Sequence, residues 1–390
     1  MKRRSRTLLI LGVTLLIALV PTLLALPRFV DARTNTVIPG KLIPVSAEAT
    51  ALHATLRVVD MHDDLLLWNR DPLQEYTRGH TDVPRLLRGG TSLQVFSAVT
   101  KTPRGLNYDS NTGDSDNITL LAVLERWPVR TWTSRTQRAL YQARRLHAAA
   151  NHSAGRLTVI TSASELDAFL KKPNAGTDAL GGILAIEGLH ALDGVLANVD
   201  TLYAAGYRMM GLTHFFDNEV AASAHGVSKG GLTLLGREVV RRMEALRITI
   251  DLAHVAPKAI DEVLSMATRP VVVSHTGVRA TCPGPRNLSD DQIKRIGANG
   301  GLIGIGYWDA AVCEIGARST ARAMRHAATI AGAQHVALGS DFDGATQVPF
   351  DATQLVQMTQ ALRDEGFTDD EIRGIMGENA IRFLLGNLPP

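Results

Sequence analysis

Eight short apolar runs, rich in Val, Ile and Leu, alternate with amphipathic stretches along most of this chain. Apolar runs of this length are typical of buried β-strands, and their regular alternation with helical patterns indicates consecutive βα units. Eight such units predict an α/β domain built as a (β/α)8 TIM-type barrel. The expected strands are residues 57–62, 93–97, 182–187, 208–214, 248–254, 270–275, 301–306 and 336–341, and the clearest helices are residues 232–246, 256–266, 289–296 and 319–331.

Six of the eight runs end in His, Asp or Glu. In a barrel the C-terminal ends of all strands share one rim, whereas a doubly wound open sheet, the rival architecture, brings only a few of them together at its switch point. The pattern therefore favours the barrel and predicts a metal site at the C-terminal rim. The residues concerned are His62 with Asp64, Glu187, His214, His254, His275 and Asp341.

Five of these residues have the chemistry of a metal centre. His62 and Asp64 are two positions apart in an extended segment, so both side chains can point at one target. His254 and His275 end consecutive strands, which are neighbours in a barrel, and Glu187 follows a strand too apolar to hold a free carboxylate cheaply. Each residue alone is more often an ordinary hydrogen-bonded side chain. Together they predict two Zn²⁺ or similar ions bridged by water.

Asp341 follows the last apolar run and opens the segment 341–344. A carboxylate in this place can take a proton from an attacking water and then pass it to a leaving amine. We therefore expect Asp341 to be the catalytic proton shuttle.

The amino terminus carries a separate signal. Four basic residues within the first six positions precede twenty uncharged residues, 7–26, and a helix of that length would reach about 30 Å, the thickness of a bilayer core. We expect residues 1–27 to be a membrane anchor or signal peptide, 28–44 a linker and 45–390 the barrel domain. Positive charge keeps the first residues cytoplasmic. This places the barrel on the periplasmic side of the inner membrane, or free in the periplasm or medium if the segment is cleaved.

Two further features bear on the compartment and the partners. Cys282 and Cys313 are the two cysteines of the chain, and after export they can persist as a disulfide or remain two buried thiols. The net charge is +3, from 41 basic and 38 acidic residues, and without the four basic residues of the amino terminus it is 37 minus 38, or −1. This balance excludes a basic surface for nucleic acids.

The motifs around these residues, in this order, resemble those of the membrane dipeptidase (renal dipeptidase, peptidase M19) family of amidohydrolase-type barrels. Each motif is a modest signal by itself, but the ordered set is specific, and the resemblance extends from about residue 58 to residue 383. The motifs are residues 59–64, 185–188, 211–214, 250–254, 273–275, 286–288, 339–344 and 377–379.

The resemblance implies a binuclear zinc site. His62 and Asp64 are expected to bind one ion, His254 and His275 the other, and Glu187 to bridge the two ions together with a water or hydroxide that attacks the substrate. This agrees with the ligand set inferred from the residues.

The resemblance also implies roles for residues around the ions. His214 is expected to polarise the scissile carbonyl or hold its oxyanion, Arg286 to bind the substrate carboxylate, and Asp341 to move the proton. The secreted animal members have a disulfide across the region that matches Cys282 and Cys313, which favours a disulfide here. Homodimers are frequent among relatives, and nothing in this sequence selects an oligomeric state.

We therefore expect a zinc-dependent dipeptidase that hydrolyses L,L- and L,D-dipeptides. One alternative is that the same barrel acts on N-acyl amino acids, β-lactams or lactones, because the same centre can activate water toward any suitably held carbonyl group. A second alternative, from another class, is a non-catalytic anchored binding protein. In such a protein we would expect at least one of the five ligands to be replaced, and all five are present.

Overall fold

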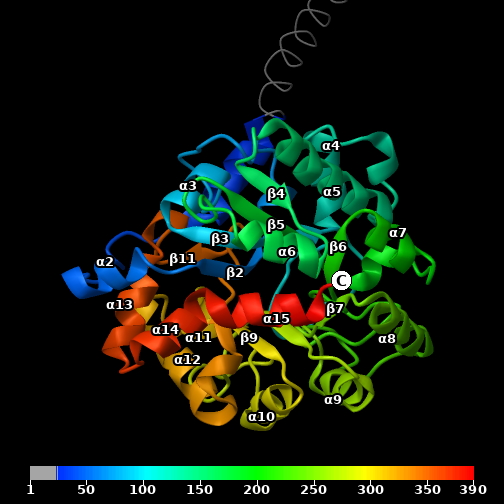
Figure 1. The fold of residues 1–390 in the computed structure, drawn as a ribbon. Coiled ribbons are helices and arrows are strands. Elements are labelled where there is room, and N and C mark those ends of the chain that lie inside the picture. The colour runs from blue at the N-terminus through cyan, green and yellow to red at the C-terminus, as the bar shows by residue number, and fades with distance from the viewer. Residues whose placement is uncertain (1–22, 24) are drawn as a thin grey trace, which may run out of the picture.

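A parallel sheet that closes on itself forms the centre of the computed structural model (Figure 1), which describes residue 23 and residues 25–390. Strands β3 and β5 pair with each other and join the two ends of the strand order β3-β2-β10-β9-β8-β7-β6-β5. The barrel strands are β2 (Val58–Asp63), β3 (Thr91–Val99), β5 (Leu180–Glu187), β6 (Tyr207–Gly211), β7 (Thr249–Asp251), β8 (Val272–Thr276), β9 (Leu302–Ile305) and β10 (Val336–Leu338).

These eight strands overlap the eight predicted runs, and the predicted (β/α)8 barrel is confirmed. A further strand, β4 (Leu157–Val159), pairs with the first half of β5, whose second half pairs with β6 along the same edge. Because all barrel strands are parallel, their C-terminal ends meet at one rim. The polar ends of the apolar runs are therefore brought together.

Three predicted strands extend too far at their C-terminal ends, namely those of residues 208–214, 248–254 and 336–341. Strands β6, β7 and β10 each end three residues before the polar residue that closes the run. The backbone leaves the strand direction there, since His254 and Asp341 have φ angles of +62° and +59°, in the left-handed region. These turns carry the polar side chains over the mouth of the barrel.

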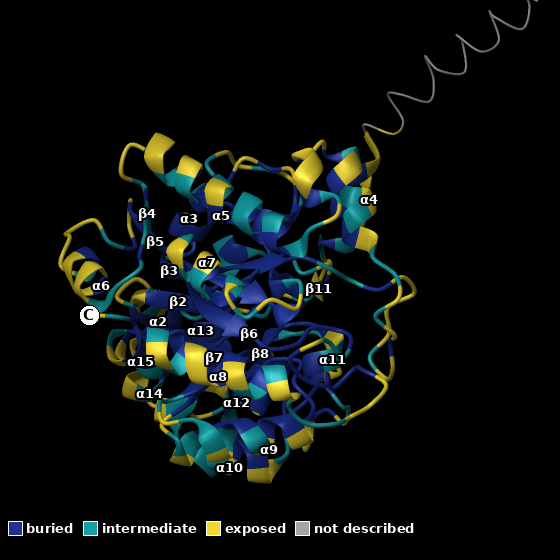
Figure 2. Ribbon diagram, turned by 90° about the vertical axis from the view of Figure 1, so that its right-hand side faces the viewer, coloured by how far each residue is buried: buried dark blue, intermediate teal, exposed yellow. Residues whose placement is uncertain are grey.

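Helices surround the barrel, and Figure 2 shows buried strands in dark blue enclosed by helices whose outward faces are exposed. The four predicted helices are confirmed as α8, α9, α10 and α12. Two of these helices begin at a side-chain cap. Ser289 and Gln292 form a capping box at the start of α10, and the Thr233 side chain caps α8. The α-helices are α2 (Ala47–His53), α3 (Val83–Arg88), α4 (Asn117–Leu124), α5 (Arg135–His152), α6 (Ala163–Leu170), α7 (Asn198–Ala204), α8 (Leu234–Leu246), α9 (Pro257–Met266), α10 (Asp290–Ala298), α11 (Asp309–Val312), α12 (Ala317–Ala331), α13 (Val356–Asp364), α14 (Asp369–Arg373) and α15 (Asn379–Asn387).

The segment before the barrel is attached to it. Residues 25–34 are helical, and β1 (Thr36–Val37) pairs in parallel with β11 (Gln347–Val348), which follows β10. Residues 28–44, the predicted linker, thus contain a helix and a paired strand. Most of the predicted anchor, residues 1–22 and 24, lies outside the described residues. In the part of the chain that is described, no helix has the length and apolar character needed to cross a membrane.

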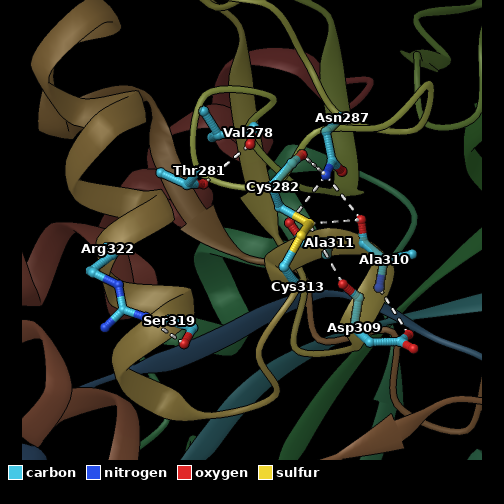
Figure 3. The surroundings of a disulfide bond; sticks show 10 residues. All are labelled: Val278, Thr281, Cys282, Asn287, Asp309, Ala310, Ala311, Cys313, Ser319 and Arg322. Atoms are coloured by element: carbon cyan, nitrogen blue, oxygen red, sulfur yellow. Dashed lines mark hydrogen bonds between the residues drawn. A yellow bond between two sulfur atoms is a disulfide. The ribbon is translucent and has the colours of Figure 1, made fainter.

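A disulfide joins Cys282 and Cys313 (Figure 3), as the resemblance favoured. It links the loop after β8 to the end of α11, which follows β9. Beside it, the Asn287 side-chain amide donates hydrogen bonds to the carbonyl oxygens of Cys282 and Ala310 at 2.7 and 2.9 Å. These contacts fix the loop that carries Arg286 against the segment that carries Trp308.

Candidate active site

The five predicted metal ligands come together at the C-terminal rim of the barrel. His62 and Asp64 lie at the end of β2, Glu187 ends β5, His254 follows β7, and His275 lies in β8. All five side chains are buried. Residues separated by as many as 213 positions in the chain therefore form one cluster.

The Glu187 carboxylate is at the centre of this cluster. Its Oε1 atom is 2.9 Å from Nε2 of His254, 3.1 Å from Nε2 of His275 and 3.8 Å from Nε2 of His62. Its Oε2 atom is 3.1 Å from Nε2 of His214. Burial raises the pKa of Glu187 well above its usual range, so positive charge nearby is needed to keep this carboxylate ionised.

The imidazole rings of His254 and His275 face the same space. Nε2 of His254 is 3.0 Å from Nε2 of His275, and burial lowers the pKa of both rings well below the usual value. Both rings are therefore neutral. Neutral imidazole nitrogens directed at one point are suited to a divalent cation.

Unpartnered buried atoms test whether metal ions fit here. Nε2 of His62 and Oδ1 of Asp64 are 3.6 Å apart, and neither has a hydrogen-bond partner among the described residues. Such atoms are rare in folded proteins unless an ion or water satisfies them. Two groups of donor atoms, each within 4.8 Å, share Glu187: one contains His62 and Asp64, the other His254 and His275. The residues present therefore fit two divalent cations.

Asp341 lies beside this cluster, with Oδ1 3.9 Å from Nε2 of His62. A Cβ atom on Gly344 would lie 2.1 Å from that Oδ1, so the glycine leaves the room that the carboxyl group occupies. Burial raises the pKa of Asp341 to about 8. A carboxyl group whose pKa is near neutrality is suited to both accepting and donating a proton.

His214 lies on the other side of Glu187. Burial lowers the pKa of His214 to about 3, so its ring is neutral and has one N–H group to donate. Nδ1 is 3.4 Å from the carbonyl oxygen of Lys101, which is long for a hydrogen bond. Nε2, which is 3.1 Å from Oε2 of Glu187, is the nitrogen that faces the site.

Arg286 is placed differently. Its Nη2 donates a hydrogen bond to the carbonyl oxygen of His275 at 2.5 Å, and its guanidinium lies 5.4 Å from the ring centroid of Trp308. The side chain is buried next to the cluster, but it is not among the residues that line the site cavity. Trp308 is the cavity residue that it contacts.

Two buried aspartates that the sequence analysis did not select hold the cluster in place. Oδ2 of Asp251, the last residue of β7, accepts a 2.5 Å hydrogen bond from the hydroxyl of Ser274, which is 2.9 Å from Nδ1 of His275. Asp60 accepts hydrogen bonds from the backbone N–H and the hydroxyl of Ser340, at 2.8 and 2.5 Å. Their signal in the sequence is their position: Asp60 is two residues before His62 and so shares its face of β2, and Asp251 ends the strand that precedes His254.

A cluster of buried ion pairs between side chains holds the loop that carries Asp341. Nη2 of Arg70 is 2.6 Å from Oδ2 of Asp343, and Nε of Arg70 is 3.2 Å from Oδ2 of Asp31 in the N-terminal helix. Although burial opposes it, the charges of Arg70 and His80 hold the pKa of Asp343 below its usual value. This cluster connects three segments that are distant in the sequence.

Replacing Arg70 with Met should lower the free energy of unfolding by about 3–5 kcal/mol, because it leaves buried carboxylates without their cation. Chemical unfolding followed by circular dichroism measures this change. Arg88→Met is the matched control, since Arg88 pairs with Glu75 on the surface and exposed pairs contribute little. An equal, small effect of the two substitutions would contradict the role given to Arg70.

A cavity of about 450 Å³ opens onto the site. This volume is in the range of small-molecule sites. Five of the polar residues described above line it, and much of the remaining wall is apolar. These five are Asp64, Glu187, His214, His254 and Asp341.

Comparisons with known proteins show what this chain is similar to. The family model described as membrane dipeptidase (peptidase family M19) matches residues 46–385. An uncharacterized dipeptidase of Schizosaccharomyces pombe is 28% identical, over 84% of this chain and 79% of its own length. The dipeptidase aclJ of Aspergillus oryzae is 26% identical, over 93% of this chain and 86% of its own.

Solved structures share the fold. A metallo peptidase from Rhodobacter sphaeroides, liganded with a phosphinate mimic of the dipeptide L-Ala-D-Ala, is 25% identical with a TM-score of 0.72, over 85% of this chain and 99% of that chain. A dipeptidase described as a metallo peptidase of family M19 has a TM-score of 0.73 at 25% identity, over 86% of this chain and 100% of that chain.

Proposed function

This chain is a metal-dependent hydrolase that belongs to the membrane dipeptidase family (peptidase family M19), and on this premise we propose that it is a zinc dipeptidase acting on L,L- and L,D-dipeptides. The observation that carries the proposal is the pair of buried donor groups that share Glu187. The dipeptide mimic bound to the Rhodobacter sphaeroides relative supports the substrate class.

In this proposal His62 and Asp64 would hold one ion, His254 and His275 would hold the second, and Glu187 would be a ligand common to the two groups. Two zinc ions held there would polarise the scissile carbonyl group and lower the pKa of an attacking water. The neutral rings and the buried carboxylates provide the nitrogen and oxygen atoms that zinc prefers.

The remaining residues act on the substrate. Asp341 accepts a proton from the attacking water and returns it to the leaving amine, for which its raised pKa is suited. His214 donates a hydrogen bond from Nε2 to the carbonyl oxygen as negative charge develops on it. Arg286, buried beside Trp308, provides the positive charge that attracts the terminal carboxylate of the substrate.

We place the enzyme outside the inner membrane. The basic residues before the uncharged segment 7–26 support an anchor or signal peptide with its first residues in the cytoplasm. The disulfide between Cys282 and Cys313 is compatible with an oxidising compartment. Fractionation of cells into membrane, periplasm and cytoplasm tests this location.

Hydrolysis of a panel of L,L- and L,D-dipeptides by the full-length chain in detergent tests the activity. We expect free amino acids to appear with the zinc-loaded protein and to be absent after chelation. The panel includes N-acyl amino acids, a β-lactam and a lactone. Turnover of these compounds by folded, zinc-loaded protein, with no cleavage of any dipeptide, would overturn the dipeptidase proposal.

A further inference from the structure

The wall of the site cavity has an acidic part and an apolar part. The acidic part contains Asp64, Glu187 and Asp341. Much of the rest is aliphatic, and no Lys or Arg is found among the described residues that line it. The larger aliphatic lining residues that are not buried are Leu26, Val30, Leu106, Leu120, Leu121 and Leu124; we call them the apolar wall.

Two segments outside the βα repeat supply most of the apolar wall. Leu26 and Val30 come from the helical segment before β1, and Leu120, Leu121 and Leu124 come from α4 in the insertion after β3. Both views show the start of the described chain beside α4 (Figures 1 and 2). The apolar wall is therefore formed by the N-terminal segment and the insertion after β3, and the barrel strands do not contribute to it.

The apolar wall is only partly covered by the protein. The exposed fraction is 36% for Leu26, 37% for Val30, 38% for Leu106 and 55% for Leu120. Single exposed apolar residues are common, but a group of them around one cavity marks a place where an apolar ligand is buried.

The N-terminal part of the apolar wall is held firmly. Asp31, one residue after Val30, pairs with Arg70 and with Arg78 at 3.2 and 2.9 Å. Asn35 accepts a hydrogen bond from the backbone N–H of Ala345 at 2.8 Å, in the loop that carries Asp341. The segment is thus fixed relative to the catalytic loop and can serve as a binding surface.

We propose that the apolar wall is a subsite for a large aliphatic or aromatic side chain, so that the enzyme selects dipeptides with such a side chain over polar or acidic ones. This proposal rests on the proposed function and specifies its substrate class. A side chain that leaves water for the wall strengthens binding in proportion to the apolar area buried. An acidic side chain gains nothing there, because its carboxylate would lose hydration against an aliphatic wall that offers it no Lys or Arg among the described lining residues.

Kinetics on matched dipeptides tests the subsite. The substrates are Leu-Ala, Phe-Ala, Ser-Ala and Asp-Ala, with Ala-Leu, Ala-Phe, Ala-Ser and Ala-Asp as the reversed set, and the enzyme is the zinc-loaded full-length chain. The varied residue is the first residue in one set and the second in the other. In at least one of the two sets, we expect kcat/KM to be at least about 10-fold higher for the Leu and Phe dipeptides than for the Ser and Asp dipeptides. Leu120→Asn and Val30→Asn should each remove most of this preference, chiefly by raising KM for the apolar substrates.

Leu234→Asn is the matched control, because Leu234 is 85% exposed at the start of α8 and does not line the cavity. It should leave the preference unchanged. Equal kcat/KM for polar and apolar dipeptides, or an unchanged preference in both wall variants, would overturn the subsite while leaving the dipeptidase activity in place.

A binding measurement separates this result from failure of the proposed function. Trp68 and Trp308 line the cavity, so dipeptide binding to the chelated protein can be followed by tryptophan fluorescence. We expect Phe-Leu to bind at least about 10-fold more tightly than Ser-Ser, and Leu120→Asn to weaken the binding of Phe-Leu alone. If no dipeptide is hydrolysed but this binding difference persists, the proposed function fails and the subsite stands; equal binding of the two dipeptides overturns the subsite.

Discussion

Replacing Glu187 with Gln should reduce the metal bound by the purified protein from two ions to one or fewer and lower kcat/KM by more than about 100-fold. Glu187 is the residue that the two donor groups share, and Gln offers a neutral oxygen in place of the charge. Loss of a residue that only hydrogen-bonds to a metal ligand typically costs about 10–100-fold in metal affinity or activity. Loss of the shared carboxylate itself should therefore cost more. Elemental analysis and dipeptide kinetics measure the two effects.

Glu125→Gln is the control for this substitution. Glu125 is also a buried carboxylate, hydrogen-bonded to the indole of Trp127 and the backbone N–H of Asn69, but it belongs to neither donor group. Its replacement should leave metal content and kcat/KM close to those of the wild type. Two ions in the Glu187→Gln protein would remove the basis for a shared ligand.

The barrel could be predicted from the sequence because its signals are local. A βα unit has a short apolar run, such as the one before Glu187, and an amphipathic helix, which in some units begins at a side-chain cap such as Ser289. The ends of the strands could not be predicted in the same way. The left-handed turns at His254 and Asp341 are held by hydrogen bonds from the hydroxyls of Thr213 and Thr346 to their carbonyl oxygens, and no local pattern in the apolar runs marks them.

The clustering of the five proposed ligands could be predicted because parallel strands force their C-terminal ends onto one rim, and this places His62 near His275 without knowledge of the intervening chain. The supporting groups depend on long-range packing. Arg70 and Asp343 are 273 positions apart, and neither lies at the end of an apolar run. Nothing in the local sequence distinguishes their buried pair from ordinary surface charges.

The apolar wall was beyond sequence analysis for a related reason. Leu26 belongs to the predicted anchor and Val30 to the predicted linker, segments that were expected to lie outside the barrel domain. Their contribution to the cavity follows from the ion pair of Asp31 with Arg70 and from the pairing of β1 with β11. These contacts fold the segment back onto the loop that carries Asp341.

Replacing Asp341 with Asn should leave two bound ions and lower kcat by about 10²–10⁴-fold, the range for loss of a general acid–base group. Asp341 is in none of the donor groups of the cluster, and Asn fills nearly the same volume beside Gly344. Asn cannot accept the proton of the attacking water, so the loss should be in kcat and not in KM. Asp370→Asn, on the exposed start of α14, should change neither quantity. If Asp341→Asn lost metal in proportion to activity, the residue would be a ligand and the proton would have to be moved by another group, for which His214 is the nearest candidate on the opposite side of Glu187.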